Sequence, residues 1–379
     1  MGEMKILFCS PNPLVKELGA PKVLIELAEA LSNLGWTCDL IGPPELVDRP
    51  FLHLIGEPFR VRYVEGLRNY LHQYASDYQV IDYDHIYLPF PRQEFDPKPL
   101  FVARSVLLAH YLETIPLPKE KDWKSQLRQW LKGSADVAEN NSMVARAKRT
   151  VQEADLVNVS NHYDKVELVR QGICPEKVMV LPYGMSVQRR SLFDDISTEL
   201  PSNPVVVFIG TFDPRKGSTD FPHILVGIHQ QIPNVNFLLL GTNKSEQKVL
   251  SKFPRYLANR IQVIPQYSSS QLSDLLKSCS VGIFPSYFEG FPFGVIEMLA
   301  AAIPVIAYDS PGAPMMLLPD YLVSTGDTEA MSQKVVDLLN DRQKLSAARQ
   351  WAKQQAKQFD WQQVAEQTSQ IYLKHCENR

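Results

Sequence analysis

Short apolar runs alternate with segments of helical periodicity along the chain. Residues 5–9 predict a strand, residues 21–31 carry leucines at helical spacing, and residues 37–41 predict a second strand. A strand, a helix and a strand in this order form a βαβ unit. Its two strands are parallel, and helices cover the sheet to which they belong.

The same alternation continues to residue 182 and starts afresh after residue 203. Residues 188–203 are polar and charged, and we interpret them as a linker. Strands alternating with helices on both sides of a linker favour an α/β protein with two Rossmann-like domains. We expect an N-terminal domain over 1–187, a C-terminal domain over 188–359 and a last helix over 360–379. The other predicted strands lie at 79–83, 100–103, 156–160, 178–182, 205–210, 236–240, 261–264, 281–285 and 304–308.

The last helix is predicted from its start signal and its apolar positions. Asp360 and Gln363 have the spacing of a capping box, which satisfies free N–H groups at the start of a helix. Trp361, Val364 and Tyr372 then supply apolar contacts. A helix with such a face needs a surface on which to pack.

Composition and charge narrow the function without changing the fold class. The 379 residues are 45% hydrophobic and 21% charged, which suits a globular protein with more than one domain. The net charge of −3 gives no basic surplus, so we expect no nucleic-acid partner. No apolar run approaches the roughly 20 residues of a membrane span, and no signal peptide is visible. Five scattered cysteines fit a reducing cytoplasm, and none has metal-binding spacing.

The segment 286–304 carries the strongest functional signal. Pro292 suits the first turn of a helix, which places Glu289 in the loop after the strand at 281–285. In an open parallel sheet, ligands bind at this carboxyl edge of the strands. Free N–H groups at 292–295 would then form a helix N-terminus suited to a phosphate.

Glu297 is the only charged residue from Phe291 to Tyr308. An isolated buried carboxylate is strongly disfavoured, so Glu297 needs hydrogen-bond donors, and sugar or ribose hydroxyls can supply them. The alternative is structural: Glu297 pairs with a basic residue or caps a neighbouring helix. Its place eight residues after Glu289, at a strand-to-helix junction, favours the ligand interpretation.

These residues resemble the Glu-x7-Glu signature of the retaining GT-B glycosyltransferases of family four, the glycosyl transferases group 1. The small-residue helix that ends before Ile303 and Pro304 is also similar to that family. The helix over 360–379 resembles the family's last helix, which crosses back onto the first domain. The resemblance implies that Glu297 holds the ribose hydroxyls of a nucleotide and that Glu289 faces the donor sugar as a catalytic residue. It also places the donor against Gly290, Phe291, Pro292, Phe293 and Gly294.

A second match lies in the loop after the first strand of the C-terminal half. Residues 209–217 resemble the family's Gly-Arg…Lys-Gly loop, whose cations neutralise the donor diphosphate. A fixed cation there stabilises the charge that the departing diphosphate gains. Gly210 and the catalytic candidate Lys216 match this pattern. Thr211 stands at the position of the family's arginine, and the neighbouring Arg215 can substitute for it. The alternative is a solvated basic loop.

The first domain matches the family less closely. Family members carry paired glycines in the first loop, and here only Gly19 remains, preceded by Leu18. They also place a histidine near the donor sugar. His110 is the catalytic candidate for this role, although a shifted alignment puts Val106 there, and His162 competes with it. A histidine flanked by apolar residues can equally be a hydrogen-bonded helix residue.

Residues 123–132 predict an amphipathic helix. Its tryptophans and leucines share one face, and Lys124, Arg128 and Lys132 line another. The composition is that of a helix lying on a membrane surface, and related enzymes often glycosylate lipid-linked acceptors. The ordinary alternative is a helix whose apolar face packs on the core.

These residues predict a cytoplasmic transferase that moves a hexosyl unit from a nucleotide-diphosphate sugar, with retention of anomeric configuration. The acceptor is a sugar, a lipid-linked molecule or another small molecule. The resemblance implies neither a cofactor nor a metal, since the loop cations and the helix N-terminus balance the diphosphate. Two alternatives remain: a nucleotide-sugar epimerase or phosphorylase of the same fold, and a degenerate protein that binds nucleotide sugar or a partner without turnover.

Overall fold

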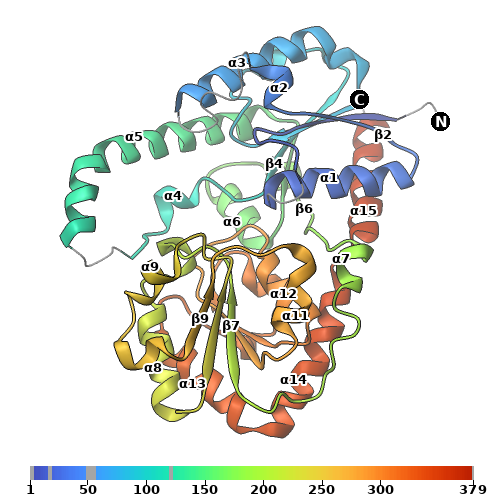
Figure 1. The fold of residues 1–379 in the computed structure, drawn as a ribbon. Helices are drawn as coiled ribbons and strands as arrows, with labels where there is room; N and C mark the ends of the chain where they lie inside the picture. The colour runs from blue at the N-terminus through green and yellow to red at the C-terminus, as the bar shows by residue number, and fades with distance from the viewer. Residues whose placement is uncertain (1–3, 16–18, 48–56, 119–122, 378–379) are drawn as a thin grey trace. The chain divides into compact units, whose positions relative to one another are not determined.

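The computed structural model describes residues 4–15, 19–47, 57–118 and 123–377, with the backbone alone at 57 and 123–137. The chain forms two compact units (Figure 1). The first unit comprises Met1–Thr114, Trp123–Gly184 and Asp360–Arg379, and the second comprises Ile115–Asp122 and Met185–Phe359. Each unit contains a six-stranded parallel sheet. The predicted α/β class with two Rossmann-like domains is therefore confirmed.

The sheet of the first unit has the strand order β2-β1-β3-β4-β5-β6. Ile6, Leu7 and Phe8 in β1 are fully buried because helices cover both faces of the sheet. The strands are β1 Lys5–Cys9, β2 Thr37–Ile41, β3 Val80–Asp84, β4 Leu100–Ser105, β5 Leu156–Val159 and β6 Val178–Val180. The helices are α1 Gly19–Asn33, α2 Pro43–Leu46, α3 Glu57–Tyr74, α4 Tyr111–Thr114, α5 Trp123–Glu153, α6 His162–Arg170 and α15 Trp361–Glu377.

The C-terminal helix α15 packs on the first unit, as predicted, and contacts α1 and β4. The Trp361 indole donates a hydrogen bond to Glu26 Oε2 at 2.5 Å. The Tyr372 hydroxyl donates to Asp82 Oδ2 at 2.8 Å, and the same carboxylate is paired with Arg104 at 2.5 Å. The side chains of Tyr372, Asp82 and Arg104 are all buried. The hydrogen bond from Tyr372 fixes the register of the helix on the sheet, because a shifted helix would withdraw a donor from a buried carboxylate.

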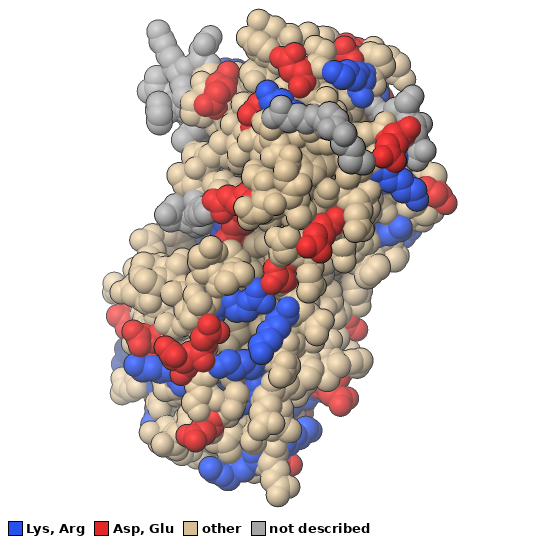
Figure 2. All heavy atoms as spheres, turned by 90° about the vertical axis from the view of Figure 1, so that its right-hand side faces the viewer, with Lys and Arg blue, Asp and Glu red and all other residues tan. Residues whose placement is uncertain are grey.

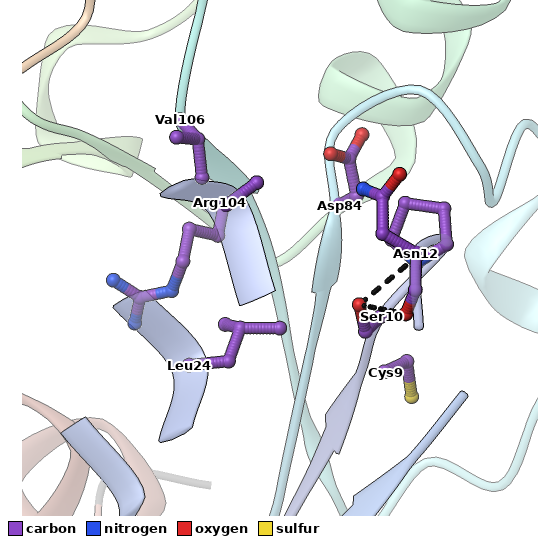
Figure 3. A pocket seen from close by; sticks show the side chains of 9 residues that line it. Cys9, Ser10, Asn12, Leu24, Asp84, Arg104 and Val106 are labelled. Carbon is purple, nitrogen blue, oxygen red and sulfur yellow. Dashed lines mark hydrogen bonds between the residues drawn. The ribbon is translucent and has the colours of Figure 1, made fainter. Parts of the chain in front are cut away.

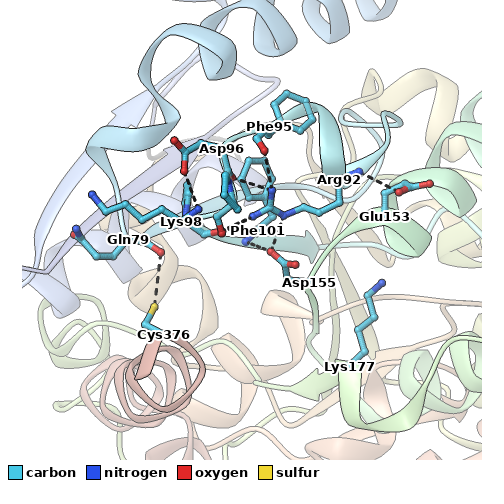
Figure 4. A network of polar contacts seen from close by, with 12 residues as sticks. Gln79, Arg92, Phe95, Asp96, Lys98, Phe101, Glu153, Asp155, Lys177 and Cys376 are labelled. Atoms are coloured by element: carbon cyan, nitrogen blue, oxygen red, sulfur yellow. Dashed lines mark hydrogen bonds and ion pairs between the residues drawn. The ribbon is translucent and has the colours of Figure 1, made fainter. Parts of the chain in front are cut away.

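A polar network holds the segment between β3 and β4 (Figure 4). The Arg92 guanidinium pairs with Asp155 at 3.0 Å and donates to backbone carbonyls within residues 95–99. Asp155 also accepts the Phe101 N–H at 2.8 Å. This network lies at the amino ends of β4 and β5, the edge opposite to the one where parallel sheets bind ligands. We therefore assign it a structural role.

The sheet of the second unit has the order β12-β11-β10-β7-β8-β9. Counted from β7, this is the Rossmann order 3-2-1-4-5-6, and the chain reverses direction across the sheet between β7 and β10. The strands are β7 Val205–Ile209, β8 Asn236–Leu240, β9 Ile261–Ile264, β10 Val281–Phe284, β11 Val305–Asp309 and β12 Leu322–Ser324. The helices are α7 Val187–Ser191, α8 Phe221–Gln231, α9 Glu246–Leu250, α10 Arg255–Ala258, α11 Leu272–Leu276, α12 Phe293–Ala300, α13 Thr328–Asn340 and α14 Arg342–Gln355.

Two elements of the second unit were not predicted. The edge strand β12 has three residues, too few for a periodic signal. The predicted linker 188–203 is in part the helix α7, where Ser186 caps the first turn by accepting the Arg189 N–H. Phe193 and Ile196 within the same segment are buried. The interpretation of 188–203 as a simple polar linker is therefore wrong.

Two surface features bear on the predicted membrane contact and on the predicted absence of a nucleic-acid partner. In the parts of the chain that the structure describes, no helix combines the length and the apolar character needed to cross a bilayer. The predicted helix at 123–132 is the start of α5, but its side chains lie outside the described residues. Its membrane contact stays a prediction. On the face shown in Figure 2, acidic and basic side chains are interspersed between wide uncharged areas.

Candidate functional site

Two loops of the second unit meet where β7 lies beside β10. The loop after β7 runs through the single 3-10 turn Pro214–Lys216, and the loop after β10 carries Glu289. The Tyr287 N–H donates to the Arg215 carbonyl at 2.8 Å, which joins the two loops. At Gly217 the backbone has φ +80°, and an added Cβ would lie 2.3 Å from the Pro285 carbonyl oxygen. Only glycine allows this approach, so the sequence itself brings the loops together.

Glu289 lies at the centre of a cluster of polar side chains from these two loops, and it is 7% exposed. Its Oε1 lies 2.7 Å from Lys216 Nζ and 2.6 Å from Arg215 Nη1. It also accepts the Ser286 hydroxyl at 2.5 Å. The structure thus brings together three residues that were predicted as site residues, and it adds Ser286, which was not predicted.

The protonation of the cluster follows from its charges. Burial alone would raise the pKa of Glu289, but Lys216 and Arg215 together hold it below its ordinary value. Burial lowers the pKa of Lys216, and the Glu289 carboxylate opposes that effect. The carboxylate is therefore ionised at neutral pH and contacts both cations, while the Asp213 carboxylate of the same turn also acts on Lys216. One planar guanidinium and one compact ammonium side by side suit a phosphate-bearing ligand.

Thr211 does not take the place of the family arginine. Its hydroxyl donates to the Asp213 carboxylate, which in turn accepts the Lys216 N–H at 3.2 Å. Thr211 and Asp213 thus stabilise the turn that presents Lys216, and Arg215 provides the second cation. Gly210 ends β7 just before this turn. Within the described ranges, no three His, Cys, Asp or Glu side chains lie where they could share a metal ion.

Glu297 lies in α12 and is 3% exposed, so its predicted burial is confirmed. Its Oε1 is paired with Nη2 of Arg189, a residue of α7. The structural interpretation, in which a basic residue balances Glu297, is the one that this structure shows. A ligand is therefore not the sole source of donors for Glu297, and its role at the ribose stays a prediction. Arg189 was not predicted, because a lone arginine in a polar stretch is usually solvated.

The start of α12 differs from the expected row of free N–H groups. The Phe293 N–H donates to the Phe291 carbonyl at 3.0 Å, and the Val295 N–H donates to the Pro292 carbonyl at 2.9 Å. Proline has no N–H of its own, so the predicted phosphate-binding terminus is wrong at these positions. Phe291 stacks edge-on with Phe293 at 5.0 Å between ring centroids.

Glycine and aromatic packing fix α12 on the sheet. An added Cβ on Gly294 would lie 2.6 Å from the Ile209 carbonyl oxygen, so glycine allows the helix to touch the end of β7. Gly290 lies between Glu289 and Phe291 in the preceding loop. The helix is thereby held against the same strand whose loop carries the two cations.

The first-domain candidates lie in the first unit. Gly19 is the first residue of α1. His110 lies in the turn before α4, is 1% exposed, and its Nδ1 has no hydrogen-bond partner among the described residues. Burial and the neighbouring His85 lower the pKa of His110 to about 3, so its imidazole is neutral. Its role near a sugar and the alternative of a hydrogen-bonded residue both stay predictions. His162, the competing histidine, is exposed at the start of α6.

A pocket lies at the carboxyl ends of β1, β3 and β4 in the first unit (Figure 3). Asn12, Asp84 and Arg104 contribute polar groups, and Leu24 of α1 contributes an apolar wall. Ser10 lines the same pocket and donates its hydroxyl to the Asn12 carbonyl at 2.8 Å. Since β1 lies between β2 and β3, the pocket is at a point where the chain reverses direction across the sheet, the usual ligand position.

Comparison with known proteins gives a family match in the second unit. Residues 192–358 match the family model described as glycosyl transferases group 1. The phosphatidyl-myo-inositol mannosyltransferase of Mycobacterium leprae is 28% identical over 200 residues, 51% of this chain and 52% of that protein. The chain thus spans about half the length of this curated relative.

Solved structures match the fold over the whole chain. The sucrose-phosphate synthase of Thermosynechococcus elongatus covers 100% of both chains with a TM-score of 0.73 and 20% identity. HepE of Anabaena, in complex with UDP and glucose, covers 98% of this chain and 100% of its own, with a TM-score of 0.62 and 16% identity. At these identities the likeness concerns the fold, which is GT-B.

Proposed function

We propose, from the match of residues 192–358 to the glycosyl transferases group 1 and from the GT-B fold of the chain, that this protein is a nucleotide-sugar-dependent hexosyltransferase. It would transfer a hexosyl unit to an acceptor hydroxyl with retention of the anomeric configuration. The observation that carries the proposal is the cluster of Glu289, Arg215 and Lys216 between the loops after β7 and β10.

The donor diphosphate would bind to the two cations of this cluster. In transfer, the bond between the anomeric carbon and the outer phosphate oxygen breaks, and the diphosphate gains negative charge. Arg215 and Lys216 are already fixed by Glu289 and the turn, so they can stabilise this charge without reorganising. The cations thus take the part that a metal has in other transferases, and we assign no resident metal or cofactor.

The acceptor oxygen would form its bond to the anomeric carbon on the face that the diphosphate leaves. The departing phosphate oxygen takes the acceptor proton, so the step needs no protein nucleophile. Glu289 would face the sugar and orient both cations, and Glu297 would accept hydrogen bonds from the ribose. The pocket with Asn12 and Asp84 in the first unit would hold acceptor hydroxyls.

The test is product analysis with a panel of UDP, GDP and ADP sugars, each offered with and without sugar or lipid-linked acceptors. The UDP sugars come first because the structural relative HepE holds UDP and glucose. Lys216→Met should lower kcat by about 100-fold or more, the usual effect of removing one transition-state donor. Lys248→Met is the matched control, since Lys248 is exposed on α9. Equal turnover by both variants would contradict the assigned role.

The same panel separates the alternatives. A product formed only with an acceptor, and with the donor's anomeric configuration by NMR, supports the retaining transferase. Conversion of the nucleotide sugar without an acceptor identifies an epimerase. Binding without any conversion identifies a degenerate transferase. A ligand at 100 times its Kd raises stability by about 2.7 kcal/mol, so thermal shifts detect binding independently of turnover.

A further inference from the structure

Arg189 has a contact that the proposed reaction does not use. It extends from α7 to Glu297, where its guanidinium pairs with the buried carboxylate. The Arg189 side chain is itself 16% exposed, and that of Glu297 is 4% exposed. Burial lowers the pKa of Arg189, and the nearby Tyr267 opposes this effect. The pair therefore lies inside the second unit and is not a surface ion pair.

The surroundings place this pair at the carboxyl edge of the sheet. The Tyr267 ring lies 3.2 Å from the Cβ position of Gly241, the residue that follows β8. On the other side, Glu297 belongs to α12, which touches the end of β7 through Gly294. Arg189 thus occupies the region between the strand ends where a nucleoside would have to enter to reach Glu297.

We propose that Arg189 stands in for the ribose when the donor site is empty, and that the ribose hydroxyls displace it from Glu297. The inference rests on the proposed function, in which Glu297 binds the ribose. It makes Arg189 a residue that sets nucleotide affinity by competition.

The exchange is balanced in hydrogen bonds. A buried carboxylate without hydrogen-bond donors destabilises the folded protein. A site that stays folded without its ligand therefore needs another donor in the place of the ribose. Arginine supplies charge-assisted donors, and a ribose diol supplies two hydroxyl donors at the same oxygens. Arg189 lies on a five-residue helix, and its long side chain can withdraw by rotamer changes without unfolding that helix.

Isothermal titration of a nucleoside diphosphate tests the proposal. The ligand is the one of UDP, GDP and ADP that gives the largest thermal shift with the wild type. Its 2′,3′-dideoxy form is titrated in parallel. Removing a competing charge-assisted hydrogen bond should tighten binding of the ribonucleotide to Arg189→Met by about tenfold. The dideoxy form cannot engage Glu297 and should bind both proteins alike. Arg190→Met, on the same helix, is the matched control and should leave both affinities unchanged.

An unchanged affinity of Arg189→Met for the ribonucleotide would overturn the proposal. A weaker affinity would also overturn it, because it would show that Arg189 itself holds the ligand. Equal tightening for the dideoxy form would overturn it as well. Should Arg189→Met give no folded protein, Arg189→Lys keeps the charge but loses the planar fork, and we expect about threefold tighter ribonucleotide binding. If the wild type binds no nucleoside diphosphate, the proposed function itself fails. If the wild type binds but the variants do not bind more tightly, only the Arg189 inference fails.

Discussion

Replacement of Glu289 by glutamine tests how the cluster holds two cations in place. The change keeps the shape of the side chain and removes one buried charge. Oε1 of Glu289 contacts Lys216 at 2.7 Å and Arg215 at 2.6 Å, and the carboxylate is 7% exposed. Without it the two cations face one another across a short distance with little water to screen them.

Breaking a buried ion pair by removing one partner costs about 3–5 kcal/mol. Arg215 and Lys216 keep some exposure, so we expect the lower limit, about 3 kcal/mol. A domain of this size loses about 2–4 °C in Tm per kcal/mol, so the transition of the second unit should fall by about 6–12 °C. The first-unit transition should not move.

Differential scanning calorimetry of the full chain measures both transitions. The pH dependence has a defined sign, because the pKa of Glu289 is lowered in the folded protein from its ordinary value of 4.5. Its stabilisation is present above the unfolded pKa and is lost as the pH falls through the folded pKa. The difference between the wild type and Glu289→Gln should therefore be largest near pH 7 and shrink in acid.

Glu246→Gln is the control, since Glu246 is exposed and its replacement should change stability by less than about 0.5 kcal/mol. Pyrophosphate should recover part of the lost stability of Glu289→Gln, because it restores negative charge beside the cations. A second-unit transition within about 1 °C of the wild type at pH 7 would refute the reasoning. It would mean that solvent, and not Glu289, balances the two cations.

Three further changes have defined outcomes. Gly217→Ala should lower the second-unit transition in calorimetry by at least about 4 °C, because a Cβ would lie 2.3 Å from the Pro285 carbonyl oxygen and φ is +80°. An unchanged transition temperature would show that the two loops separate freely. Arg92→Ala should destabilise the first unit alone by about 3 kcal/mol in the same experiment, since it removes the ion pair with Asp155 and the hydrogen bonds to several backbone carbonyls. His110→Leu should remove a pH dependence in urea unfolding. With a folded pKa of about 3 against 6.5, the unfolded wild type takes up a proton that the folded one refuses, so wild-type stability falls by about 2 kcal/mol between pH 6.5 and 5. A variant that retains this fall would exclude His110 as its source.

The sequence alone predicted eleven of the twelve strands in the described ranges, and it placed Glu289 in the loop after β10. Strands such as β7 and β8 were predicted within one residue of their bounds because a buried parallel strand is a continuous apolar run between turn signals. Pro292 fixed the loop that carries Glu289, since proline is excluded from the helix interior. The loop with Lys216 was selected by its resemblance to the Gly-Arg…Lys-Gly loop of the family and not by a local folding signal.

The tertiary structure alone decided which side chains meet. The pairing of Glu297 with Arg189 joins two residues far apart in the sequence, and no local pattern encodes such a contact. The strand order, which sets β7 beside β10 and so brings Lys216 to Glu289, depends on the packing of whole βα units. The burial of His110 without a partner for Nδ1 follows likewise from the surrounding fold. Periodicity acts over a few residues, whereas the charge balance of a buried site is set by every element that packs around it.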